Sequence, residues 1–272
     1  MLTPGDVRAL LARHGLAPHK SFGQNFVVAQ NTVRKVVRDA EVATGDLVVE
    51  VGPGLGSLTL ALREAGAEVI AIEIDAGLVR ALRDVVGADD GVVIVHADAL
   101  EVDYADLVAG RPALLGANLP YNVATPILMT ALRTQLFERL LVMVQREVGE
   151  RWIAGVGNPL YGAVSVKIAA LARATIASRV SRNVFFPVPN VDSVTVRLER
   201  REDAAAGDVD HVFGLIDAGF EQRRKRLRNT LAHLGHEPAA VETALEAIGR
   251  SPGSRAEELD LAAWVALAAA IG

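Results

Sequence analysis

The stretch LVVEVGPGLGS, residues 47–57, joins a short apolar run to three closely spaced glycines. The run at 47–51 is rich in valine and has the length of a buried strand. Gly52, Gly54 and Gly56 follow it, and the next residues have helical periodicity. Because glycine has no Cβ, a strand-to-helix turn of this kind lets a ligand approach the backbone closely. Close packing of the helix on the strand would need the same glycines, so the turn alone fits either reading.

Apolar, β-branched runs recur along the first half of the chain and alternate with helical patterns. The expected strands lie at 47–51, 68–74, 92–97, 113–117 and 140–145. Strands that are apolar on both faces and are separated by helices indicate a parallel sheet covered on both sides, so the expected fold class is α/β. Residues 193–200 differ, because apolar and polar residues alternate there, which suggests an edge or antiparallel strand.

A change in composition near residue 200 marks the expected domain boundary. Residues 200–208 are charged or small, as in a linker. Only helical patterns follow, at 209–222, 223–235, 238–249 and 260–271. We therefore expect an α/β domain over 1–200, which holds the ligand site, and a small all-helical domain over 201–272.

Composition limits the classes of protein to which the chain can belong. Its 272 residues are 51% hydrophobic, enough to bury a sizeable core. The absence of cysteine excludes disulfides and thiolate nucleophiles and fits a reducing, cytoplasmic setting. The N-terminus lacks the apolar core of a signal peptide, and the apolar stretch at 261–271 is shorter than the roughly 20 residues that span a bilayer. We therefore expect no membrane association. The six histidines are scattered, so we also expect no metal site.

The charge is unevenly distributed. The formal net charge is −5, yet residues 223–228 read RRKRLR and contain no acid. The cations of this run are Arg223, Arg224, Lys225, Arg226 and Arg228. A basic cluster on an acidic protein is a candidate contact for a phosphate backbone. A solvated helix face is the other reading, and the run alone does not separate the two.

The glycine turn differs from the fingerprint of a dinucleotide site. That fingerprint is G-x-G-x-x-G, whereas Gly52, Gly54 and Gly56 are spaced G-x-G-x-G. Pro53 also lacks an N–H where a pyrophosphate would accept several. These two differences favour a nucleoside ligand without a phosphate chain, and S-adenosyl-L-methionine is the obvious candidate.

Acidic side chains accompany the ends of three expected strands. Glu73 comes 21 residues after Gly52, where a carboxylate can accept hydrogen bonds from ribose hydroxyls. Asp98 follows the third strand, and Glu50 lies near the end of the first. Ligands of open parallel sheets bind at this carboxyl edge, and acids there are costly to desolvate unless a ligand needs them. Solvated loop acids remain the alternative for each residue, but the set favours a cofactor site.

Asn118, Leu119, Pro120 and Tyr121 end the fourth expected strand and form a candidate reacting site. A target amine has two N–H donors, which the Asn118 side-chain oxygen and the Leu119 carbonyl could both accept. Pro120 fixes φ and stiffens this pair, while Tyr121 offers a ring face for a flipped-out base. Catalysis would then be mostly orientation. An ordinary Asn-x-Pro turn explains the four residues alone, but their position after the glycine turn and the acids favours the amine site.

Several stretches, in order, resemble the small-subunit ribosomal RNA adenine N6,N6-dimethyltransferases. They are KSFGQNF (20–26), VEVGPGLG (49–56), IEID (72–75), NLPYN (118–122), QREVGER (145–151), YGAVSV (161–166), FFPVPNVDS (185–193) and EQRRKRLRNTL (221–231). The resemblance implies that methyl groups pass from S-adenosyl-L-methionine to N6 of two adjacent adenines, two methyl groups to each. These adenines lie in the loop of the last hairpin of small-subunit rRNA.

The resemblance also implies a fold and residue roles. The fold would be a Rossmann-like methyltransferase sheet in the order 3-2-1-4-5-7-6, with strand 7 antiparallel. The family's cofactor contacts fall on Asn25, Val27, Gly52, Glu73, Asp98 and Asn118, and Gly54 belongs to the same turn. Asn25 would lie in an N-terminal segment that folds over the cofactor. Phe185 would stack on the adenine opposite Tyr121, whereas we expect Phe186 to be buried in the core.

The implied partners are small-subunit rRNA and the immature small subunit, bound through the helical domain and its basic run by a monomeric chain. Asn190 departs from the lysine that relatives commonly have, which puts a basic RNA contact there in doubt. A large-subunit rRNA adenine methyltransferase of the antibiotic-resistance type is the nearest alternative, although the basic run and FGQNF favour the small subunit. The intact candidate site disfavours a non-enzymatic assembly or transcription factor, and the glycine spacing disfavours a dinucleotide oxidoreductase.

Overall fold

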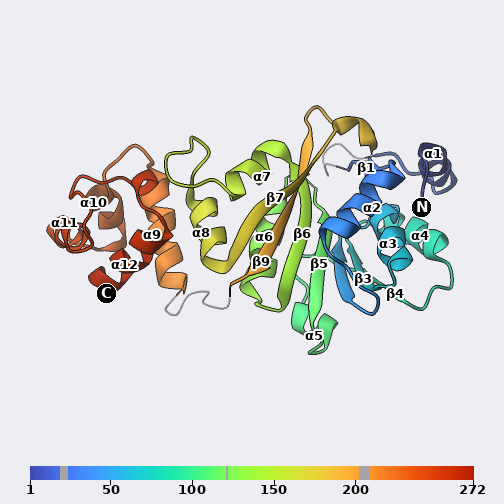
Figure 1. Ribbon diagram of the computed structural model, residues 1–272, viewed down its shortest axis with the longest axis horizontal. Helices are drawn as coiled ribbons and strands as arrows, with labels where there is room; N and C mark the ends of the chain where they lie inside the picture. Colours follow the sequence, from blue (N-terminus) through green and yellow to red (C-terminus); the bar gives the residue numbers. More distant parts are fainter. Residues whose placement is uncertain (19–23, 121, 202–208) are drawn as a thin grey trace. The chain divides into compact units, whose positions relative to one another are not determined.

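The protein is described by a computed structural model over residues 1–18, 24–120, 122–201 and 209–272 (Figure 1). Within these ranges a seven-stranded sheet has the order β4-β3-β2-β5-β6-β9-β7. Its strands are β2 (Leu47–Val51), β3 (Glu68–Glu73), β4 (Val92–His96), β5 (Ala113–Asn118), β6 (Phe137–Gln145), β7 (Ala172–Val180) and β9 (Ser193–Arg200). Numbered along the chain within the sheet, this order is 3-2-1-4-5-7-6, so the expected topology is confirmed.

The pairing of the strands gathers their carboxyl ends at one edge. β2 is parallel to β3 and β5, β3 to β4, and β5 to β6. Val51, at the end of β2, is level with Ile72 of β3 and Ala117 of β5. β9 is antiparallel to β6, as expected, but it lies between β6 and β7 and is not an edge strand.

Helices connect the parallel strands (Figure 1). The helices before β9 are α1 (Pro4–Arg13), α2 (Gln30–Asp39), α3 (Ser57–Glu64), α4 (Ala76–Val86), α5 (Tyr104–Val108), α6 (Ala124–Arg133), α7 (Arg146–Trp152) and α8 (Ala163–Leu171). Leu62 of α3 and Leu82 of α4 pack in one buried cluster with Val48 and Val69 of the sheet. All five residues of β2 are buried, because the strand is central and is covered on both faces.

A two-residue ribbon joins the N-terminal segment to the region before β9. β1 (Phe26–Val27) pairs antiparallel with β8 (Phe185–Phe186), and the Val28 N–H donates to the Val184 carbonyl at 2.8 Å. Since side chains alternate along a strand, the two phenylalanines enter different clusters. Phe185 packs with the main core, whereas Phe186 packs with the cluster that contains residues of α1.

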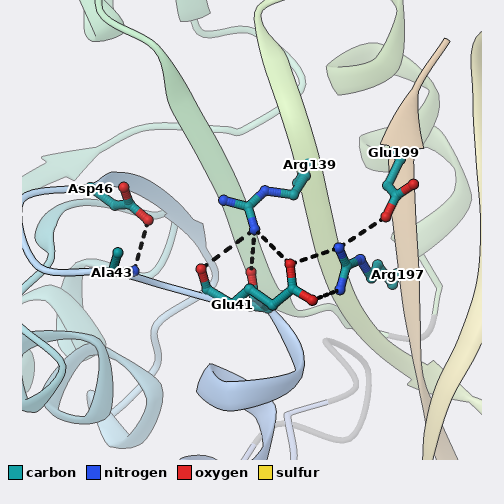
Figure 2. Close-up of polar contacts among 7 residues, drawn as sticks. Glu41, Ala43, Asp46, Arg139, Arg197 and Glu199 are labelled. Carbon is teal, nitrogen blue, oxygen red and sulfur yellow. Dashed lines mark hydrogen bonds and ion pairs between the residues drawn. The ribbon is translucent and has the colours of Figure 1, made fainter.

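An ion-pair network ties the end of α2 to the sheet (Figure 2). Arg197 of β9 donates from both terminal nitrogens to the Glu41 carboxylate, at 2.5 and 2.8 Å. Arg139 of β6 donates to the same carboxylate at 3.1 Å, and Arg197 also pairs with Glu199 at 2.9 Å. Glu41 has φ 53°, a left-handed conformation that is strained for a residue with a Cβ. The bidentate pair with Arg197 offsets this strain and holds the turn after α2 against β6 and β9.

The chain divides into two compact units. The first contains Met1–Gly149 and Ala174–Arg200, and the second contains Glu150–Arg173 and Arg201–Gly272. The expected boundary near residue 200 coincides with one transition between the units, and the second unit also takes Glu150–Arg173.

The C-terminal part of the second unit is helical, as expected. Its elements are α9 (Val209–Glu221), α10 (Leu227–Thr230), η3 (Leu231–Leu234), α11 (Pro238–Ala247), η4 (Ala256–Glu258) and α12 (Leu261–Ile271). The prediction of one helix over 223–235 is wrong, because a turn precedes α10 and a 3₁₀ helix follows it. None of the helices among the described residues is long and apolar enough to cross a membrane.

Candidate active site

A cavity of about 370 Å³ opens at the carboxyl edge of the parallel strands. It is lined by the ends of β2, β3 and β5, the segment after β4, and residues of the N-terminal segment that includes β1. Of the residues proposed from the sequence, Asn25, Val27, Gly52, Gly54, Glu73, Asp98, Asn118, Leu119 and Pro120 line it. These side chains come from distant parts of the sequence, and parallel pairing brings them together.

The glycine turn combines close packing at one glycine with open space at another. Gly52, Gly54 and Gly56 all have positive φ, at 68°, 57° and 87°. A Cβ at Gly56 would lie 2.7 Å from Leu82 of α4, so this glycine permits close packing. A Cβ at Gly52 would meet no atom nearer than 3.8 Å, so the space beside it belongs to the cavity. The absence of a Cβ thus leaves open space beside the backbone at Gly52, while at Gly56 it permits close packing.

Glu73 is a buried carboxylate at the end of β3. One oxygen accepts from the Gly54 N–H at 3.0 Å and the other from the Asp75 N–H at 3.0 Å. Burial raises the pKa of Glu73, and the backbone hydrogen bonds from Asp75 and Gly54 oppose the rise. Each oxygen can accept a second hydrogen bond, so the carboxylate can also accept hydrogen bonds from the ribose hydroxyls of a ligand in the cavity.

Glu50 is a second buried carboxyl group in the cavity wall, and it is only 1% exposed. The Thr59 hydroxyl of α3 donates to one of its oxygens at 2.6 Å. Burial raises the pKa of Glu50 to about 8, and the nearby Glu73 carboxylate adds to the rise. The sequence singled out Glu50 only as one acid of a set, because nothing in its spacing reveals how deeply it is buried.

Asp98 and two apolar side chains complete the side of the cavity near β4. The Asp98 carboxylate is half-buried and accepts from the Leu100 N–H at 2.8 Å. Ile74 and Leu100 also line the cavity, although they are 60% and 39% exposed. Exposed apolar side chains beside a polar group suit the flat face and the polar edge of a nucleobase. Sequence reasoning missed both residues, since Ile74 ends an apolar strand pattern and Leu100 is a single large apolar residue after Asp98.

The Asn118 amide is oriented by the backbone of the N-terminal segment. Its Nδ2 donates to the Asn25 carbonyl at 3.0 Å. A carbonyl can only accept, so this contact identifies which end of the amide is nitrogen and leaves Oδ1 for a donor. The Leu119 N–H donates to the Met143 carbonyl at 3.1 Å, which holds the start of the turn on β6. Tyr121, the expected stacking residue, lies outside the described residues.

Phe185 differs from the open stacking ring that the sequence led us to expect. It is 2% exposed and packs in the core with Val27, Leu141 and Met143. The ribbon of β1 and β8 is the cause, because its register turns Phe185 toward the sheet. Phe186, expected in the core, is only partly buried, and the Arg8 guanidinium lies 5.3 Å from the centre of its ring. The exposures of the two rings are therefore the reverse of the expectation.

The basic run begins in the turn between α9 and α10 and ends in α10, where Arg228 lies. We call residues 223–226 the basic turn, and the run contains two kinds of cation. Arg223 donates to Glu257 at 2.6 Å and to the Pro159 carbonyl at 3.1 Å. Arg228 is paired with Glu242. Arg224, Lys225 and Arg226 are exposed. Two of the five cations thus have acid partners within the fold, and the other three are exposed. Asn190 is exposed as well, and its carbonyl accepts from Arg182 at 3.2 Å.

The chemistry of the cavity fits a cationic nucleoside cofactor. Four of the described lining residues are acids, and none is lysine or arginine. The acids are Glu73, Asp75, Asp98 and Glu50, and the raised pKa of Glu50, about 8, favours its uncharged form near neutral pH. Such a lining repels phosphate and attracts a sulfonium or an ammonium group. Together with the sheet order, this cavity defines a Rossmann-like methyltransferase that uses S-adenosyl-L-methionine.

Comparison with known proteins identifies the family. The model of the family described as ribosomal RNA adenine dimethylase matches residues 15–268, and the chain belongs to this family. Ribosomal RNA small subunit methyltransferase A of Leifsonia xyli subsp. xyli is 48% identical over 277 residues, covering 99% of this chain and 98% of the relative. The protein of the same name from Streptomyces griseus subsp. griseus is 48% identical over 276 residues, covering 98% and 94%.

Solved structures agree with the fold. A dimethyladenosine transferase from Plasmodium falciparum superposes with a TM-score of 0.74 at 23% identity, covering 87% of this chain and 94% of that one. The 23S rRNA methyltransferase ErmE superposes with a TM-score of 0.69 at 24% identity, covering 91% and 99%. ErmE is named as a methyltransferase of 23S rRNA, the large-subunit RNA. The shared fold therefore does not by itself identify the substrate.

Proposed function

We propose that the protein transfers methyl groups from S-adenosyl-L-methionine to N6 of two adjacent adenines in the 3′-terminal hairpin loop of small-subunit rRNA. The products are N6,N6-dimethyladenines, formed while the subunit matures. Membership of the family and the names of the two relatives support this substrate class. The observation that carries the proposal is the Asn118 amide, whose nitrogen is bonded to the Asn25 carbonyl and whose oxygen remains for an amine.

In this proposal the cofactor lies along the acids and the glycine turn. Glu73 accepts from the ribose, Asp98 from the base, and Gly52 and Gly54 give access to the backbone. Asn25 and Val27 close the site from the N-terminal segment. When bound, S-adenosyl-L-methionine supplies an electrophilic methyl group.

The reacting end of the site then acts mainly by orientation. Asn118 Oδ1 and the Leu119 carbonyl accept hydrogen bonds from the two N–H groups of the amine. These bonds turn the nitrogen lone pair toward the cofactor. Pro120 keeps the two acceptors at a fixed spacing. The proton that the alkylated nitrogen loses passes to water. Tyr121 stacks on the flipped adenine, and Phe185 joins it only if its ring leaves the cluster that buries it.

We also infer that RNA contacts the exposed part of the basic turn. Arg224, Lys225 and Arg226 lack acid partners among the described residues and are exposed. Arg223 and Arg228 serve the fold, because their partners Glu257 and Glu242 hold them. The proposed partner is an immature small subunit, bound by a monomer in the cytoplasm.

Mapping of transferred methyl groups tests the function. The protein is incubated with tritiated S-adenosyl-L-methionine and undermethylated small subunits, and the labelled bases are located by primer extension. We expect label only at two adjacent adenines of the last hairpin, and labelling slower by about a hundredfold or more with Asn118→Ala. Label in naked large-subunit rRNA, with none in small subunits, would select the large-subunit alternative. Failure to bind the cofactor by calorimetry would select a non-enzymatic role.

A further inference from the structure

The segment Gln24–Val28 touches the candidate site at three points. The Asn25 carbonyl accepts from Asn118 Nδ2 at 3.0 Å. The Phe26 ring lies against the glycine turn, since a Cβ at Gly54 would be 3.0 Å from it. The Val27 carbonyl accepts from the Ser57 hydroxyl at 2.7 Å. One short segment therefore connects the glycine turn with the Asn118 amide, the proposed acceptor for the target amine.

The orientation of Asn118 depends on where the Asn25 carbonyl lies. An amide side chain presents a donor and an acceptor at almost the same place, so only its partners decide which end faces the substrate. The Asn25 carbonyl is the partner that holds the nitrogen. A shift of this carbonyl by about 1 Å would lengthen that bond beyond the normal range and free the amide to turn. The position of Asn118 Oδ1, the proposed amine acceptor, therefore depends on the position of the backbone at Asn25.

Pairing in the ribbon is a weak anchor for this backbone. β1 and β8 pair over only two residues each, and a ribbon this short is marginal alone. Ser57 supplies a separate anchor, because it is the first residue of α3 and its helix is held by buried Leu58, Ala61 and Leu62. Its hydroxyl bonds to Val27, two residues from Asn25.

We propose that Ser57 is a positioning residue for methyl transfer, which acts through the Val27 carbonyl to place the Asn25 carbonyl and hence the Asn118 amide. Ser57 needs no contact with the target amine in this role. The inference rests on the proposed function, because it concerns the geometry of the same reacting site. It also predicts that, without cofactor, loss of the Ser57 hydroxyl makes the backbone of Gln24–Val28 more mobile.

The test compares three variants. Ser57→Ala removes the hydroxyl, and Ser57→Thr retains one. Thr134→Ala is the matched control, because the Thr134 hydroxyl donates to the Ala131 carbonyl at 2.7 Å, the same length, and Thr134 does not line the cavity. Each protein is measured for single-turnover methyl transfer at saturating cofactor and for cofactor Kd by calorimetry. Hydrogen exchange of the amides of 24–28 is followed without cofactor.

We expect Ser57→Ala to transfer methyl groups about tenfold more slowly, as loss of one orienting hydrogen bond would cause. Its cofactor Kd should rise by less than about threefold, because the acids and the glycine turn remain. Exchange at 24–28 should accelerate in Ser57→Ala, while Ser57→Thr and Thr134→Ala stay near the wild type in rate and exchange.

Several results would overturn the inference. They are a wild-type rate or wild-type exchange in Ser57→Ala, equal slowing in Thr134→Ala, or no rescue in Ser57→Thr. Failure of the proposed function has a different signature, since the wild-type protein itself would then leave the hairpin adenines unlabelled. The exchange measurement still decides in that case whether Ser57 anchors the segment.

Discussion

At the scale of single residues, the Glu50 carboxyl group is the clearest case of a side chain whose burial opposes its charge. Burial raises its pKa to about 8, whereas a glutamate in an unfolded chain has a pKa of about 4.3. Between these values the folded chain holds a proton that the unfolded chain has lost. The free energy of unfolding therefore falls as the pH rises through this window.

Glu50→Gln should remove this dependence while keeping an acceptor for the Thr59 hydroxyl. We expect the cofactor-free variant to melt near the wild-type temperature at pH 5 and several degrees above it at pH 8. Thermal unfolding of both proteins from pH 5 to pH 9 measures the difference. Glu101→Gln, at an exposed position, is the control for loss of a carboxyl group. Parallel curves for Glu50→Gln and the wild type would show that Glu50 is ionised in the folded chain.

Asn118 allows a prediction about the reaction itself. Asn118→Ala removes one acceptor for the amine, and we expect methyl transfer to fall by about a hundredfold or more. Most of the cofactor affinity should remain, because Gly52, Glu73 and Asp98 are unchanged. Calorimetry with S-adenosyl-L-methionine and single-turnover transfer separate the two effects. Normal transfer in the variant would refute the assignment of Asn118 as an amine acceptor.

At the scale of elements, the basic turn shows how a structure divides a run that the sequence presents as uniform. Replacing Arg224, Lys225 and Arg226 by alanine should weaken binding to small subunits. The slope of log affinity against log salt should also become shallower by about one for each phosphate that the variant no longer neutralises. The melting temperature should stay near that of the wild type, because these side chains are exposed. Binding titrations at several salt concentrations measure the slope.

The paired cations of the same basic run, Arg223 and Arg228, are the control. Arg223→Ala with Arg228→Ala should lower the melting temperature, because Glu257 and Glu242 lose their partners. The salt slope should change less than in the triple variant. Equal slopes in the triple variant and the wild type would assign the exposed cations to a solvated surface.

Four of the strands that the sequence revealed share a physical feature, whereas another, β4, is only partly buried or exposed along its length. β2, β3, β5 and β6 are mostly buried, so their apolar runs carry a strong signal. β7 consists mainly of small and polar residues, with an exposed side chain at every second position between its buried ends, and no continuous apolar run marks it. β1 and β8 have two residues each, and only their mutual pairing makes them strands.

The site residues also divide into those that the sequence could predict and those that depend on tertiary contacts. Glu73, Asp98 and Asn118 could be predicted because each stands at the end of a parallel strand, and parallel strands end at one edge. The burial of Phe185 and the bond from Asn118 to the Asn25 carbonyl could not, since both depend on how the N-terminal segment pairs with β8. Likewise, Arg223 and Arg228 are bound by acids that lie 34 and 14 residues away in the chain.

At the scale of the whole molecule, the two units divide the proposed tasks. Every described residue that lines the cavity belongs to the first unit, and the basic turn belongs to the second. A ligand that binds only the folded state stabilises what it binds by about 2.7 kcal/mol at a hundred times its Kd. Binding of S-adenosyl-L-methionine should therefore stabilise the first unit directly.

We expect cofactor at this concentration to raise the melting temperature of the first unit by roughly 5–10 °C. Protection from hydrogen exchange should concentrate at 24–27, 50–58, 72–78 and 97–100, the segments that contain many of the lining residues. The amides of α11 and α12 should stay unchanged. Calorimetric melting and exchange mass spectrometry with and without cofactor measure both effects. Glu73→Ala is the control, since it should lose most of the protection by weakening the ribose contact. Protection confined to the basic turn, with none around the cavity, would place the cofactor elsewhere and refute the assignment of the site.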